Sequence, residues 1–403
     1  MKKRTDINKS KDQFTIHMKK LSETVGIPLA TTHVGKYPRP SWYDYDFEDR
    51  SPSEVQAHDS TILEQYSDAV KAVFKDQELL GLDILSDGCF RYDEKGFLAE
   101  WWVNGFCRMG GLKRWITKPD GDTVIKSVIT PECWKEVMSH YPNSHTSPSP
   151  PWEWPFWYTV EDEISPGKLD GLVEFYNLTK SFSTKPIKFS IADVILGGYT
   201  LVDRYYHDDR ETLFALAKVF NRMLTDLATS GCPIIQLDWS LAGLHHVANK
   251  TKVRPEVWNE MIELFNEEVK GVNAQVWIHF CFGRLGDSLG LNCAETFKHI
   301  ADCRADVIQI EAANTRGRFL KDELTNWKEH CPDKEIGLGI VSPYNLNSER
   351  PEQAAELIMT ALQFVEAERL VLTTDEGFRI NRTRSQEKLK TLVEAASIAR
   401  KSR

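Results

Sequence analysis

The sequence lacks the features that would place it among membrane, secreted or nucleic-acid-binding proteins. No apolar run in its 403 residues approaches the roughly 20 needed to span a bilayer. The basic residues within positions 1–9 precede no apolar segment, so they do not form a secretory signal. A formal charge of −9 argues against nucleic acid or an anionic membrane as partner. The eight cysteines lack the spacing of a disulfide framework. These absences predict a cytoplasmic protein with reduced thiols.

Short apolar segments instead alternate regularly with helical patterns. We expect strands at 27–35, 82–88, 188–194, 233–238, 275–281, 306–311, 336–341 and 369–374. We expect helices at about 60–80, 210–230, 255–270, 290–302, 318–330 and 351–367. Eight such units predict an α/β fold, a closed (β/α)8 TIM barrel spanning residues 27–403. An open doubly wound sheet would explain only six of the units.

Two parts of the chain stand outside this alternation. Residues 1–26 are polar and predict a mobile arm or a first amphipathic helix. Residues from about 95 to 185, after the second strand, are rich in tryptophan and proline. They predict an insertion with its own hairpins, acting as a lid or as the contact of a homo-oligomer.

A candidate metal site lies at the end of the fifth expected strand. Side chains two residues apart in a strand point to the same face, so His279 and Cys281 can offer nitrogen and sulfur to one ion. This donor pair favours zinc. The alternative is a buried strand whose cysteine only fills the core.

Acidic residues at later strand ends could complete such a site. Catalytic groups of TIM barrels lie at the C-terminal ends of the strands, where Glu311 and Glu376 are expected. Three protein ligands plus an exchangeable position is the pattern of a catalytic zinc. Either glutamate could instead pair with a nearby arginine, Arg316, Arg318 or Arg379.

Several motifs in the right order resemble the C-terminal barrel of cobalamin-independent methionine synthases. They are TTHVGKYPRP at 31–40, IIQLD at 234–238, HFC at 279–281, IQIEAAN at 308–314, IGLGIVSPYN at 336–345 and RLVLTTDEGF at 369–378. The resemblance covers most of residues 28–398 apart from the insertion. The sequence contains no counterpart of the family's N-terminal barrel, so the resemblance implies a single-barrel member of the family.

The resemblance implies a zinc-activated thiolate that attacks a carbon electrophile. His279, Cys281 and Glu311 match three of the family's four zinc ligands. Glu376 stands where the family has a cysteine. It would be the fourth metal ligand or a residue for proton transfer, and its carboxylate could favour a divalent metal other than zinc.

The resemblance also implies a substrate site that departs from the family pattern. Asp238 matches an amine-contacting carboxylate, but Cys89 replaces the family's second one. Cys89 would fill space or supply a thiolate to the metal. Arg204 replaces a folate-stacking tryptophan and favours an anionic partner.

The first strand end would bind an acidic head group. Residues 34–36 match the family's carboxylate-binding turn, where we expect His33, Gly35, Lys36 and Arg39 to contact the substrate; the two cations could equally be solvated. Around the pocket we expect His245 in acid–base chemistry and Trp239 and Tyr344 as walls.

These observations favour zinc-dependent methyl or alkyl transfer to a small thiol, with a substrate pair other than homocysteine and folate. A lyase, or a decarboxylase resembling uroporphyrinogen decarboxylase, that cleaves a C–S or C–C bond of a small anionic substrate is the alternative. A metal-binding scaffold without turnover is a third possibility, which the polar strand ends argue against.

Overall fold

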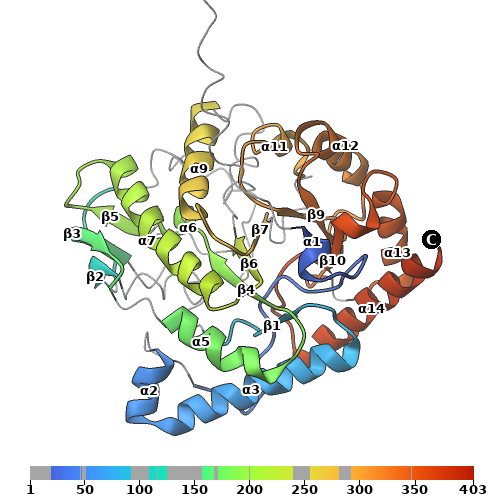
Figure 1. Ribbon diagram of the computed structural model, residues 1–403, viewed down its shortest axis with the longest axis horizontal. Coiled ribbons are helices and arrows are strands. Elements are labelled where there is room, and N and C mark those ends of the chain that lie inside the picture. Colours follow the sequence, from blue (N-terminus) through green and yellow to red (C-terminus); the bar gives the residue numbers. More distant parts are fainter. Residues whose placement is uncertain are drawn as a thin grey trace, which may run out of the picture.

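A curled parallel sheet of seven strands forms the centre of the protein (Figure 1). The computed structural model describes residues 20–45, 47, 51–91, 109–115, 117–124, 157–167, 171–198, 200–238, 255–280, 292–345 and 347–403. In sheet order, the strands are β1 (Leu85–Ser86), β4 (Ile187–Ala192), β6 (Ile234–Asp238), β7 (Gln275–His279), β8 (Val307–Glu311), β9 (Glu335–Val341) and β10 (Leu370–Thr374). All six neighbouring pairs are parallel, so the C-terminal ends of the strands lie at one edge.

The segment around Thr31 lies between the two outer strands of this sheet. Thr31 forms a parallel bridge with Leu372 of β10. Its carbonyl oxygen accepts hydrogen bonds of 3.0 Å from the N–H groups of Asp83 and Ile84, just before β1. A full strand was expected at 27–35, but Pro28 has no N–H to donate and Leu29 has a left-handed φ of 55°. The segment therefore pairs over a much shorter length than a regular strand.

Helices surround the outside of the sheet (Figure 1). The longer ones are α3 (Ser60–Leu80), α5 (Gly171–Thr179), α7 (Asp209–Thr229), α9 (Pro255–Glu268), α12 (Leu320–His330), α13 (Pro351–Ala361) and α14 (Arg382–Lys401). The shorter ones are α1 (Leu21–Thr24), α2 (Pro52–His58), α6 (Val194–Gly198), α11 (Ala294–Phe297) and the 3-10 turns η3 (Lys180–Phe182) and η4 (Ala367–Arg369). α14 packs against both α13 and α3, so the last helix lies beside the first long one.

Helix boundaries follow local sequence signals. α3 begins after Asp59, whose carboxylate accepts a hydrogen bond from the Thr61 N–H, and ends at Gly81 with φ of 91°. The helices expected at 290–302 and 351–367 are shorter in the structure. α11 covers only Ala294–Phe297, and α13 ends at Ala361.

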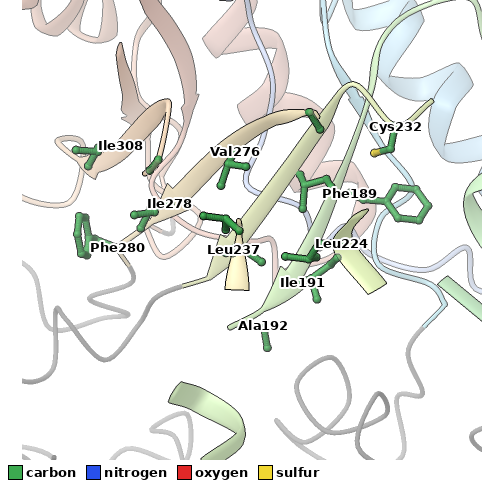
Figure 2. Packing of buried hydrophobic residues seen from close by; sticks show 14 of the residues in the cluster. Phe189, Ile191, Ala192, Leu224, Cys232, Leu237, Val276, Ile278, Phe280 and Ile308 are labelled. Carbon is green, nitrogen blue, oxygen red and sulfur yellow. The ribbon is translucent and has the colours of Figure 1, made fainter. Parts of the chain in front are cut away.

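The strands bury both of their faces. Outward-facing side chains such as Phe189 and Ile191 pack with Leu224 of α7 in the large core between sheet and helices (Figure 2). Inward-facing Ile234 and Trp277 form a second cluster with Leu21 of α1. The N-terminal segment, insofar as it is described, thus closes the interior at the end opposite the strand C-termini.

A second, smaller sheet is built from β2 (Gly110–Trp115), β3 (Trp157–Ser165) and β5 (Leu201–Asp203). β2 and β3 are antiparallel and come from the range 95–185, where hairpins were expected. The same range contains α5, which packs between α3 and α7. Among the described residues, no helix is long and apolar enough to cross a membrane.

Candidate metal centre at the strand ends

Three side chains that could hold a metal ion meet at the C-terminal edge of the large sheet. His279 ends β7, Glu311 ends β8, and Glu376 follows β10. One potential ligand atom from each residue lies within 4.8 Å of the other two, and all three residues are buried. The curl of the sheet brings together residues that are almost 100 positions apart in the sequence.

The imidazole of His279 contacts the carboxylate of Asp238 on one side and the backbone of Asp375 on the other. Its Nδ1 is 3.3 Å from Oδ1 of Asp238, a close ionic contact without hydrogen-bond geometry. Its Nε2 is 2.9 Å from the backbone carbonyl oxygen of Asp375. Burial alone lowers the pKa of His279, but Glu376, Asp238 and the Asp375 carbonyl outweigh it and raise the pKa to about 9. The site therefore favours a positive charge.

Glu311 is held in place by the loop that follows it. The side-chain amide of Asn314 donates a 2.7 Å hydrogen bond to Oε2 of Glu311. The hydroxyl of Ser342, just after β9, donates in turn to the Asn314 side-chain oxygen. These contacts fix one carboxylate oxygen and the orientation of the amide.

Asp375 organises the same loop from the other side. Its carboxylate accepts hydrogen bonds of 3.0, 3.1 and 2.5 Å from the backbone N–H groups of Ala312, Ala313 and Asn314. Burial raises the pKa of Asp375 well above its usual value, although these three donors oppose the shift. Asp375 thus links β10 to the loop after β8.

The donor set fits a divalent cation. Two buried carboxylates within 4.8 Å of each other repel unless a positive charge lies between them. One nitrogen and two oxygens are ordinary zinc ligands and also suit other transition metals. The expected ligand Cys281 lies outside the described residues.

The first, second and third strand ends of the expected barrel meet at Gly35. A side chain on Gly35 would place its Cβ 2.5 Å from Oγ of Ser190 and 3.4 Å from Sγ of Cys89. Burial, the largest effect, raises the pKa of Cys89 to about 12, so its thiol is protonated. Cys89 lies beside Gly35 and is not a member of the donor cluster found among the described residues.

The neighbouring residues of the first strand end are buried. The Val34 N–H donates a 3.2 Å hydrogen bond to Oγ1 of Thr374. His33 is buried beside the rings of Tyr37 and Phe378. Burial, helped by the charge of Lys188, lowers the pKa of His33 to about 3, so its imidazole is neutral.

The two expected cations of this segment differ in their surroundings. Arg39 donates a 2.9 Å hydrogen bond to the carbonyl of Tyr45 and lies over the ring of Tyr43. The Lys36 side chain is half-buried, and its backbone carbonyl accepts a 2.9 Å hydrogen bond from the Phe378 N–H.

The contacts described for Arg204 and Tyr344 lie outside the cluster of His279, Glu311 and Glu376. Arg204 is exposed, 3.7 Å from a carboxylate oxygen of Glu161, and near the ring of Trp115 on the small sheet. Tyr344 lines a surface cavity of about 1000 Å³ between α12 and α13, together with Arg316. Trp239 and His245 fall outside the described residues.

The sequence pattern gave no role to several residues that shape the site. Asn314 lies three residues after Glu311 and Asp375 directly precedes Glu376, but their contacts depend on the fold. Lys188, Gln236 and Gln309 are polar residues inside apolar strands, and all three are buried in the interior of the sheet. A polar residue at every second position of an apolar strand is the signal that could have indicated this layer.

Comparisons with known proteins identify the family of this chain. A family model described as cobalamin-independent synthase, catalytic domain, matches residues 170–398. A methionine synthase of Saccharolobus solfataricus is 28% identical over 383 residues, which cover 92% of this chain and 95% of that protein. One from Sulfolobus acidocaldarius is 27% identical over 379 residues and covers 92% of each chain.

Solved structures show the same fold. A B12-independent methionine synthase from Shewanella sp. W3-18-1, in complex with selenomethionine, superposes with a TM-score of 0.69 at 21% identity, covering 93% of this chain and 99% of that one. A vitamin-B12-independent methionine synthase from Listeria monocytogenes, described as putative, gives a TM-score of 0.58 at 16% identity, covering 92% and 99%. With more than half of its length matched by the family model, the chain belongs to the cobalamin-independent methionine synthase family.

Proposed function

We propose that the protein is a metal-dependent alkyltransferase, most simply a methyltransferase, that acts on a small thiol. The observation that carries the proposal is the convergence of His279, Glu311 and Glu376 within 4.8 Å at the strand ends. Family membership supports the same chemistry, since the relatives are methionine synthases.

The metal would be zinc, held by His279, Glu311, Glu376 and Cys281. Cys281 follows His279 by two residues and has the soft donor that zinc prefers. A zinc ion there would lower the pKa of a bound thiol and make it nucleophilic at neutral pH. Because Glu376 stands at the family's cysteine position, it would act as fourth ligand or accept the proton of the thiol.

The thiol substrate would carry an acidic head group. Cys89 is uncharged and buried, so it cannot replace the family's glutamate as partner of an ammonium group. Asp238 would be the one remaining carboxylate for such a group, but it already faces His279. We propose that Lys36 and Gly35 face the acid group of the substrate, and that Arg204 takes part in binding an anionic donor.

The proposed architecture is a single closed (β/α)8 barrel over residues 27–403, with an insertion after its second strand. The hydrogen bonds of Thr31 to the segment before β1, and those of Ala30 and Thr32 to Leu372 of β10, support closure. The contact of α14 with α3 supports it from the helical layer.

Metal content is the test of this proposal. We would load the purified protein with zinc and measure bound metal by elemental analysis, beside His279→Gln and Glu376→Gln. Exposed Glu352→Gln is the matched control. We expect about one zinc per chain, lost in His279→Gln and bound at least about 10-fold more weakly in Glu376→Gln.

Substrate class is tested next with the zinc-loaded protein. Methyl transfer to mercaptocarboxylates and mercaptosulfonates without an ammonium group should exceed transfer to homocysteine. A parent protein that binds no zinc would contradict the activated-thiol mechanism, and product release from one substrate alone would favour the lyase or decarboxylase.

A further inference from the structure

The backbone of the first strand end is held by buried side chains of β4. Nζ of Lys188 donates hydrogen bonds to the carbonyl oxygens of His33 at 2.7 Å and Val34 at 3.1 Å. The hydroxyl of Ser190, two residues further along β4, donates a 2.8 Å hydrogen bond to the same Val34 oxygen. Both side chains are buried, so two successive carbonyl groups are fixed in direction.

These fixed carbonyl groups also orient the N–H groups of the same peptides. In a trans peptide the C=O and N–H groups point in opposite directions. The N–H that follows the first carbonyl belongs to Val34, and it donates a 3.2 Å hydrogen bond to Oγ1 of Thr374. The N–H that follows the second carbonyl belongs to Gly35, and it therefore points away from the two donors on β4.

The N–H of Gly35 makes no hydrogen bond within the part of the chain that the structure describes, although Gly35 is buried. The carbonyl of Gly35 is engaged, because it accepts a 3.1 Å hydrogen bond from the hydroxyl of Ser86 on β1. Buried backbone N–H groups are nearly always paired in native proteins. An acceptor atom of a bound ligand would satisfy this one.

A positive charge lies behind the same peptide. The third hydrogen-bond partner of the Lys188 ammonium is Oε1 of Gln236, and the ring centroid of Trp277 lies 5.1 Å from it. These partners are uncharged, and no carboxylate of the described residues contacts the ammonium. Burial lowers the pKa of Lys188 to about 7, although the nearby charge of Asp238 opposes the shift. A bound anion would supply the charge that a buried cation needs.

This turn adjoins the segment that carries Glu376. Oγ1 of Thr374, which accepts the hydrogen bond described above, donates a 2.8 Å hydrogen bond to the carbonyl of Glu376. A Cβ at Gly377 would lie 3.4 Å from the backbone nitrogen of Lys36. An acid group bound at Gly35 would thus lie beside the segment of the metal centre.

We propose that Lys188 and Ser190 are positioning residues, which turn the N–H of Gly35 toward the acid group of the substrate. Lys188 also supplies the positive charge that favours an anion there. Neither side chain touches the substrate, because each acts through the Val34–Gly35 peptide. This inference rests on the proposed function, in which the thiol substrate carries an acidic group.

The test compares three substitutions of buried residues. Ser190→Ala removes one of the two donors to the Val34 carbonyl, and Lys188→Met removes the other donor together with the charge. Ser67→Ala is the matched control, because Ser67 is a buried serine on α3 whose hydroxyl donates to the Leu63 carbonyl on the same helix. Circular dichroism checks that each variant is folded.

The first measurement compares an acid with its uncharged isostere. Calorimetric titration of the zinc-loaded protein at pH 6.5 gives dissociation constants for 4-mercaptobutyrate and 4-mercaptobutyramide, and for the shorter 3-mercaptopropionate and its amide. We expect the parent to prefer the acid at least about 10-fold at one of the two lengths. Ser190→Ala should reduce this preference about 3-fold and leave binding of the amide and of zinc unchanged. Lys188→Met should abolish the preference, and Ser67→Ala should keep it.

The second measurement observes the Gly35 N–H itself. Labelling with carbonyl-¹³C valine and ¹⁵N glycine selects glycines that directly follow a valine, and the sequence has two, Gly26 and Gly35. Val25→Ile removes the Gly26 signal and so assigns both. The Gly35 amide proton should move downfield when the acid is added but not when the amide is added, and the Gly26 signal should not move. The movement should be smaller in Ser190→Ala.

The outcomes separate this inference from the proposed function. Equal affinity of the parent for acid and amide at both lengths, or an unchanged preference in Ser190→Ala, would overturn the positioning role while zinc binding stands. If Lys188→Met fails to fold, Ser190→Ala still decides the question. A parent that binds no zinc would overturn the proposed function, and butyrate against butyramide, which need no metal, would then test the Gly35 site with the same variants.

Discussion

Gly339 on β9 leaves the space that the carboxylate of Asp375 occupies. A Cβ at position 339 would lie 2.2 Å from Oδ1 of Asp375 and 2.9 Å from its Cα. The absence of a side chain on one strand thus allows the neighbouring strand end to bind the loop after β8 through three backbone N–H groups. The position of Glu311 depends on this arrangement, since Asn314 belongs to that loop.

We predict that Gly339→Ala destabilises the protein by about 1–3 kcal/mol, the usual range for overpacking a core. The added methyl group must displace Asp375 and so weaken its hydrogen bonds to the loop. Chemical denaturation measures the change in the free energy of unfolding. Gly271→Ala is the control, because nothing lies within 4 Å of its added Cβ and only its φ of 72° is unfavourable. An unchanged free energy of unfolding in Gly339→Ala would show that the Asp375 contact does not restrict this position.

Asn314→Ala should weaken zinc binding about 10-fold, within the range found for residues that orient metal ligands. The substitution removes the amide that holds Oε2 of Glu311, while Glu311 itself remains. Isothermal titration or chelator competition gives the affinity. Asn326→Ala on α12 is the control, since that amide donates to the carbonyl of Asp322 on the same helix. The role assigned to Asn314 is wrong if both variants bind zinc as the parent does.

Glu335 should make the protein less stable as the pH rises from 5 to 8. Burial, the largest effect, raises the pKa of Glu335 from 4.5 to about 7, although the Leu21 N–H and Arg369 oppose it. Between these two values the folded state keeps a proton that the unfolded state has lost. The stabilisation is complete below pH 4.5 and disappears as the pH passes 7.

Glu335→Gln removes this titration. Between pH 5 and 8 the free energy of unfolding of the parent should fall by roughly 1–3 kcal/mol relative to that of the variant. Urea denaturation at each pH measures it. Glu352→Gln, at an exposed position of α13, should follow the parent. If the free energy of unfolding depends on pH in the same way in the parent and in Glu335→Gln, Glu335 is not the group responsible.

Cys89 should be unreactive and dispensable for metal binding. Its thiol is buried, and its pKa of about 12 leaves almost no thiolate at neutral pH. Peptide mapping after native alkylation at pH 7.5 should find Cys89 unmodified. Cys89→Ser should keep the zinc stoichiometry of the parent. Loss of zinc in this variant would instead identify Cys89 as a ligand.

Much of this protein could be read from local sequence. The apolar runs around Ile234–Asp238 and Val307–Glu311 predicted buried parallel strands within a residue of their observed bounds. Burial on both faces leaves a continuous apolar pattern that needs no tertiary information. The motifs that contain His279 and Glu311 likewise predicted the family, which the comparisons confirm. The short pairing at Thr31 was not predictable from the apolar pattern alone.

The tertiary structure alone decided how the site is held together. Asp375 and the loop at 312–314 are about 60 positions apart, and Lys188 and Gln236 are 48 apart. No local pattern reveals such contacts, because they depend on the register of neighbouring strands and on the curl of the sheet. The sequence by itself determined which side chains stand at the strand ends. Only the packing of strands against one another decided which of those side chains meet and which donor faces which acceptor.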